Sequence, residues 1–258
     1  AMLIQEQGNL GYDVSEAEKM IPEGLKYYHQ KNDIALYRHH VRLLNALFES
    51  PKDPEADYWK YPEYATFDQY AAAVQFPEYP DFAIGEKELF DKVHAGWVAQ
   101  VCAGAVGTAV EGFHTLNLEE AFGSIDKYMK EPEMYNDDLT FEITFLETFQ
   151  RKGYDLTAAD VAEDWAAWLP FAFTAEGFAL RNIKMGMFPP ESATFRNPYY
   201  EMIGAMMRGA ICGMVAPGNP KLAAKLAWED ASVSHFNNDV LGEIFNAVMV
   251  SLGFVEKD

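Results

Sequence analysis

Apolar positions recur every three or four residues along most of the chain, which is the period of an amphipathic α-helix. No stretch alternates apolar and polar residues over a length that would make a strand. We therefore predict an all-α fold. The expected helices span residues 15–30, 33–48, 86–110, 118–129, 137–152, 157–168, 175–185, 199–215, 220–232 and 239–255.

Two proline-containing segments interrupt this helical pattern. Residues 49–64 contain three prolines and residues 76–85 contain two. Proline favours extended backbone for the residue before it, so the first segment is expected to be an extended surface connection. We place a domain boundary at the second segment. Residues 1–85 then form a helical, aromatic-rich N-terminal portion, and residues 86–258 form the main helical domain.

The longest uncharged run, residues 93–110, has roughly the length of a membrane-spanning helix. It also contains His94, Gln100 and three glycines, and charged residues stand at both of its ends. We interpret it as a buried helix whose small residues form a contact face, and we expect no association with a membrane.

The composition sets limits on the partners. Hydrophobic residues make up 49% of the chain, which indicates a packed core, and the net charge of -20 opposes binding to nucleic acid or to anionic lipid. Cys102 and Cys212 stand alone in the sequence, so we expect buried free thiols and neither a disulfide nor a zinc site. The first residues lack the pattern of a secretory signal, which leads us to expect a soluble, cytoplasmic protein.

Two adjacent carboxylates, Asp137 and Asp138, follow Asn136 at the start of the helix expected at residues 137–152. That helix is apolar nearly all round, so it should lie centrally in the fold. Carboxylates at a partly buried helix start need a positive partner, and Mg²⁺ prefers such oxygen ligands. The alternative is simple capping, because Asn and Asp are favoured at helix starts.

Three isolated polar residues are further candidates. Glu111 leaves the glycine-rich helix and would be either a base or orienting group in a cleft, or a solvated side chain. Arg208 lies in an apolar stretch and needs a partner, either a ligand anion or an internal carboxylate. His235 lies in a polar segment between two helices, where it would orient a ribose hydroxyl or phosphate or have a structural role.

The order of these features resembles the ADP-ribosylglycohydrolase family over residues 92–255. It also resembles a bacterial branch of the family that carries Asn-Asp-Asp-Leu-Thr where other members have Thr-Asp-Asp-Thr. The features that carry the resemblance are, in order, Gly96-Trp97, Gly104, Gly107, Glu111-Gly112, residues 136–140, Asn182, Gly186, Pro189-Pro190, residues 204–209 and Ser234-His235.

The resemblance implies an orthogonal all-helical bundle with a dinuclear Mg²⁺ centre, sometimes Mn²⁺, that hydrolyses a glycosidic bond to ADP-ribose. It implies that Asn136, Asp137 and Asp138 are metal ligands. It places Glu111, together with Asp138, at the reaction centre, and His235 near an ADP-ribose-like ligand.

The sequence departs from this family in one respect. Members carry a second acidic motif, Asp-x-Asp-Thr/Ser, near their C-terminus, and this sequence has none after His235. The expected fold is therefore that of the family without its C-terminal part. Our first hypothesis is a metal-dependent hydrolase of an ADP-ribosyl or related ribosyl linkage. The alternative is a non-catalytic or half-site module that binds a nucleotide-like ligand or pairs with a complementary chain.

The helix expected at residues 239–255 carries more apolar positions than one buried face requires. Apolar patches of this kind usually mark an interface. We expect the patch to be covered by a second copy, by a complementary chain or by the N-terminal portion folding back.

Overall fold

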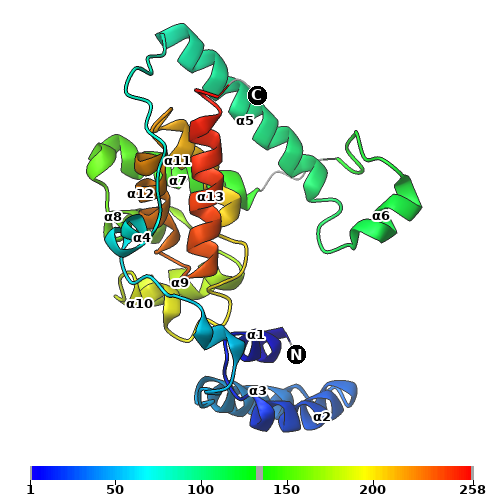
Figure 1. Cartoon of the computed structure of the whole chain (residues 1–258). Helices are drawn as coiled ribbons and strands as arrows, with labels where there is room; N and C mark the ends of the chain where they lie inside the picture. The colour runs from blue at the N-terminus through cyan, green and yellow to red at the C-terminus, as the bar shows by residue number, and fades with distance from the viewer. Residues whose placement is uncertain (1, 132–135, 257–258) are drawn as a thin grey trace.

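The computed structural model describes residues 2–131 and 136–256, and within them it contains helices and no β-strand (Figure 1). The all-α prediction is confirmed. The α-helices are α1 (Met2–Asn9), α2 (Ser15–His29), α3 (Asp33–Phe48), α4 (Phe67–Ala73), α5 (Glu86–Gly107), α6 (Thr115–Phe122), α7 (Asp137–Lys152), α8 (Ala158–Trp168), α9 (Thr174–Lys184), α10 (Glu191–Thr194), α11 (Ala210–Met214), α12 (Pro220–Ala231) and α13 (Asn238–Leu252).

Local capping explains where several helices begin. The side chain of Asn32 caps α3, and Asn219 caps α12, which has a proline in its first turn. Thr157 and Asp160 form a reciprocal capping box at the start of α8, as their spacing predicts. These starts could be placed from sequence because the cap and the backbone groups that it satisfies lie within four residues of each other.

Two expected helices differ from the structure. The helix expected at residues 118–129 is α6, which runs from Thr115 to Phe122 and does not continue to residue 129. The helix expected at residues 199–215 is not continuous. The structure has a turn, a short 3-10 helix at Met206–Arg208 and then α11. Glycines at positions 204 and 209 disfavour a continuous helix, and both stand where a side chain would collide with a neighbour. A Cβ on Gly209 would lie 2.7 Å from Cγ of Glu243 on α13.

The main core is formed by α7–α9 and α11–α13 (Figure 1). A separate small apolar cluster holds α1, α2 and α3 together at the other end of the molecule. The largest fully buried apolar side chains of the main core are Trp165, Phe145, Leu156, Leu226, Val161, Val233 and Val240.

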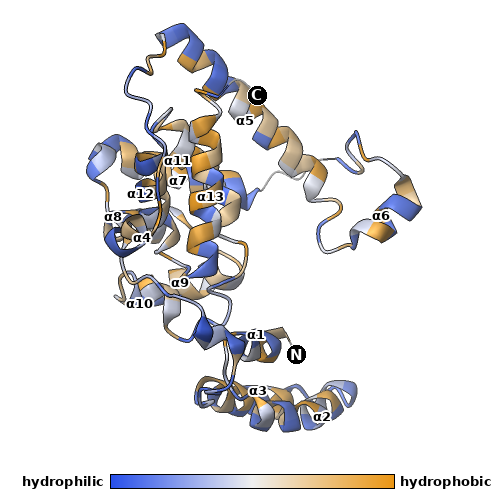
Figure 2. Cartoon of the chain, viewed as in Figure 1, coloured by the Kyte–Doolittle hydropathy of each residue, from blue (hydrophilic) through white to orange (hydrophobic). Residues whose placement is uncertain are grey.

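The expected burial of residues 93–110 is wrong in the described part of the chain. No residue of α5 is buried, and Val98 is 48% exposed. The small-residue contact face does exist, because Gly96 packs against Met214. The other faces of α5 remain apolar and open, and α6 projects beyond it (Figures 1 and 2). None of the described helices combines the length and apolarity needed to cross a membrane.

Helix α13 is also partly uncovered. Its inner face packs against α11 and α12, whereas Phe245 and Met249 are 59% and 56% exposed. The N-terminal helices α1–α3 lie at the far end of the molecule (Figure 1) and leave this face open. Folding back of the N-terminal portion over these two residues, one of the three expected covers, is therefore not seen. Covering by a second copy or a complementary chain stays a prediction.

Candidate functional site

The acidic pair lies at the start of α7, as predicted. The side-chain oxygen of Asn136 accepts a hydrogen bond from the backbone N–H of Leu139 at 2.9 Å, so Asn136 caps the helix. Asp137 and Asp138 form the first turn, and both are half-buried. The positive end of the helix dipole stabilises carboxylates in this position.

Helix α5 approaches the same place through Gly104. A Cβ on Gly104 would lie 3.1 Å from Nδ2 of Asn136 and 3.9 Å from Oδ2 of Asp138. Beyond the end of α5 the exposed Glu111 acts on this site through its charge. Burial raises the pKa of Asp138, and the negative charges of Asp137 and, less strongly, Glu111 raise it further. The structure therefore places Glu111 close enough to Asp138 for its charge to raise the pKa of that carboxyl group.

One turn along α7 lies Glu142, which sequence reasoning missed. Its side chain is fully buried, and Nε2 of Gln100 on α5 donates to its Oε1 at 2.6 Å. Burial raises the pKa of Glu142 to about 8, so it is mainly protonated at neutral pH. The available signal was an acidic residue between Phe141 and Ile143 in an apolar helix.

The described residues contain no cluster of three His, Cys, Asp or Glu side chains placed to hold a metal ion. The oxygen donors at the start of α7 are two carboxylates and the amide of Asn136. These are hard ligands of the kind that Mg²⁺ and Mn²⁺ take.

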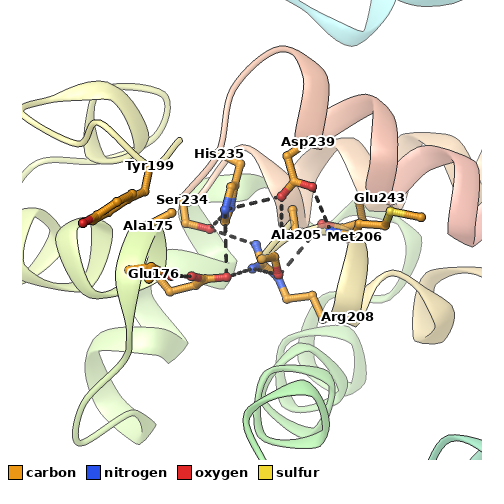
Figure 3. A network of polar contacts seen from close by, with 12 residues as sticks. Ala175, Glu176, Tyr199, Ala205, Met206, Arg208, Ser234, His235, Asp239 and Glu243 are labelled. Atoms are coloured by element: carbon orange, nitrogen blue, oxygen red, sulfur yellow. Dashed lines mark hydrogen bonds and ion pairs between the residues drawn. The ribbon is translucent and has the colours of Figure 1, made fainter. Parts of the chain in front are cut away.

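Arg208 lies in a separate buried network (Figure 3). Its Nε donates to Oδ2 of Asp230 at 2.5 Å and its Nη1 to Oε1 of Glu176 at 3.1 Å, while Oε2 of Glu243 lies 4.0 Å from Nε. The guanidinium is 1% exposed. Its partners are thus internal carboxylates, one of the two alternatives that the sequence left open.

His235 belongs to the same network and is fully buried. Its Nδ1 lies 2.8 Å from Oγ of Ser234, and its Nε2 lies 3.4 Å from Oδ2 of Asp239. Burial lowers the pKa of His235 well below its usual value, and the charge of Arg208 acts in the same direction. The imidazole is therefore neutral at physiological pH.

The network contains more carboxyl groups than the guanidinium can balance. Burial raises the pKa of Glu176 to about 7 and that of Asp239 to about 6, and it also raises the pKa of Glu243 well above its usual value. The charge of Asp137 contributes to the shift at Glu176, which couples the network to the acidic pair. Sequence could not show this assembly, because its members come from α9, α12, α13 and the segment before α11.

The fold and the site together define an all-α protein with an oxygen-rich acidic site between a glycine-bearing helix and the start of a core helix. The sequence model of the ADP-ribosylglycohydrolase family matches residues 85–258, which is more than half of the chain. The chain belongs to the ADP-ribosylglycohydrolase family, as the resemblance predicted. Comparisons with curated proteins and with solved structures found no match. Family membership supports a hydrolase of the glycohydrolase type.

Proposed function

We propose that the chain hydrolyses the glycosidic bond between ADP-ribose, or a related ribosyl group, and its acceptor, with Mg²⁺ or Mn²⁺ bound at the start of α7. The observation that carries this proposal is the charge at that place. Asp138 is half-buried beside Asp137 and within the field of Glu111, and no described basic side chain forms a salt bridge with any of the three.

The residues present fit a hard divalent cation. A bound cation would neutralise the repulsion that raises the pKa of Asp138, and it would take carboxylate oxygens as ligands. The side-chain oxygen of Asn136 accepts one hydrogen bond from the backbone and has a second lone pair available. Gly104 leaves the space in front of these groups free of a side chain.

In the proposed mechanism Asn136, Asp137 and Asp138 would hold the cation. When bound, the cation supplies Lewis-acid polarisation of the linkage and eases the deprotonation of water. In this proposal the exposed carboxylate of Glu111, whose charge acts on Asp138, would accept a proton from the attacking water or orient it. Glu142 lies one turn further along α7 than Asp138. Because burial keeps Glu142 mainly protonated at neutral pH, it adds no further negative charge to the site.

The ligand contacts expected of Arg208 and His235 stay predictions. In the structure both side chains are enclosed by Glu176, Asp230 and Asp239. A role at the ligand therefore requires contact through this network or a rearrangement of it.

The first prediction concerns metal binding. Calorimetric titration of the full chain with MnCl₂ should show weak binding, because three oxygen donors supply only part of a usual ligand set. Asp137→Asn should abolish it, since it removes a charge from the site. The matched control is Glu147→Gln, which removes an exposed charge elsewhere on α7 and should leave binding unchanged. Tight binding that survives Asp137→Asn would contradict the metal assignment.

The same variants test catalysis. Release of ADP-ribose from an ADP-ribosylated peptide should require added Mg²⁺ or Mn²⁺ and should be lost in Asp138→Asn but kept in Glu147→Gln. Ligand binding by the wild type without any turnover would instead support the non-catalytic module.

A further inference from the structure

The hydroxyl of Ser234 links two members of the buried network. Nη2 of Arg208 donates to its Oγ at 3.0 Å, and Nδ1 of His235 lies 2.8 Å from the same atom (Figure 3). All three side chains are buried. The proton positions in this chain of hydrogen bonds can be assigned, because each group has a fixed number of donors and acceptors.

A guanidinium can only donate, so Oγ of Ser234 accepts from Arg208. The hydroxyl proton must then go to another acceptor. Among the described residues Nδ1 of His235 is the one acceptor within hydrogen-bond distance of that oxygen. The hydroxyl therefore donates to Nδ1, and Nδ1 carries no proton.

The other side of the imidazole leads to the same assignment. Nε2 faces Oδ2 of Asp239 at 3.4 Å and Oε1 of Glu176 at 4.0 Å, and none of the described residues offers it a closer partner. A lone pair on Nε2 would face carboxyl oxygens, whereas an N–H there is attracted to them. Since the imidazole is neutral, its single proton lies on Nε2.

We propose that Ser234 is a positioning residue which, held by Arg208, fixes His235 in the Nε2–H tautomer. His235 is then a hydrogen-bond donor at Nε2 and not a base. The nature of the ligand rests on the proposed function. The ligand atom that His235 recognises is then an oxygen acceptor, a hydroxyl or phosphate oxygen, that takes the place of the Asp239 carboxyl oxygen at Nε2.

The test is long-range ¹H–¹⁵N correlation NMR of the full chain labelled at its six histidines. His39 is an internal reference, because its Nε2 lies 2.8 Å from the carbonyl oxygen of Met20, which can only accept. The wild type should show His235 with a proton on Nε2 and a hydrogen-bonded, unprotonated Nδ1. Ser234→Ala should shift the Nδ1 resonance toward that of an unbonded nitrogen, Ser234→Thr should restore it, and His39 should not move.

A proton on Nδ1 of His235 in the wild type would overturn the proposal, even if the variants failed to fold. An unchanged Nδ1 resonance in folded Ser234→Ala would overturn the role of Ser234. These readouts do not depend on turnover, so an inactive wild type would count against the proposed function and leave the tautomer assignment standing.

Discussion

Arg208 shows how a single buried charge depends on its partners. It is surrounded by Asp230, Glu176 and Glu243 in the main core, where an unpaired carboxylate would be costly. Arg208→Met keeps much of the side-chain volume and removes the positive charge. We expect it to lower the free energy of unfolding by about 3–5 kcal/mol at pH 8, as measured by urea denaturation.

The control is Arg151→Met, which breaks the more exposed ion pair with Asp164. Exposed pairs contribute little, so no comparable loss is expected. The loss in Arg208→Met should also be smaller at pH 6, where the freed carboxyl groups take up protons more readily. Equal, small losses in the two variants would show that the buried pair adds nothing to stability.

The candidate site was predictable where its residues are neighbours in sequence. Residues 136–138 could be placed together because one helix start presents them side by side. The place of Glu111 at the reaction centre was implied by the family resemblance and stays a prediction, although its charge raises the pKa of Asp138. Gln100 was not singled out, because its pairing with Glu142 depends on how α5 crosses α7, and periodicity contains no information on that crossing.

At the level of helices, α11 and α13 approach each other closely at Gly213. A Cβ there would lie inside contact distance of the backbone oxygen of Ala247 and 2.7 Å from Cβ of Val250. Because backbone cannot move aside cheaply, Gly213→Ala should lower the free energy of unfolding by about 1–3 kcal/mol despite the better helix propensity of alanine. Urea denaturation measures this.

Gly107→Ala is the matched control, since no described atom lies within 4 Å of a Cβ added at the end of α5. It should be neutral or slightly stabilising. If Gly213→Ala were equally harmless, α11 and α13 would pack less closely than described.

The sequence predicted which segments are helical for most of the chain, but it did not predict which helices pack against each other. Caps such as Thr157 act within one turn, so sequence places them well. The break within residues 199–215 arises from side chains of α9 and α13 that press against glycines, which is tertiary information. For α5 the apolar pattern showed which residues could be buried. How many of them are buried depends on the contacts that α5 makes with the rest of the fold.

The whole molecule combines a net charge of -20 with buried carboxyl groups whose pKa burial raises toward or above neutral pH. Burial raises the pKa of Glu142 to about 8, of Glu176 to about 7 and of Asp239 to about 6. A raised carboxyl pKa means that the folded state binds the proton more tightly than the unfolded chain. The stability from these protons is complete at low pH and is lost as pH rises through the folded pKa.

We therefore expect the urea midpoint to rise as pH falls from 8 to about 6.5. Below that, the pKa of His235, which burial depresses, works against further gain, because the unfolded chain then takes up a proton that the folded state resists. Glu142→Gln supplies a neutral carboxyl analogue and should reduce the slope between pH 8 and 6.5. A midpoint that falls over this interval would contradict the prediction.

Because α5 contacts the core through one face, its docking and the binding of a ligand at the site are linked. Gly104 lies on α5 and Glu111 follows the end of that helix, whereas Asp137 and Asp138 belong to α7. Anything that binds across both helices adds its binding free energy to the docking of α5. Amide hydrogens of α5 would then exchange more slowly when the site is filled, and loosening α5 far from the acidic pair would weaken binding by the same factor.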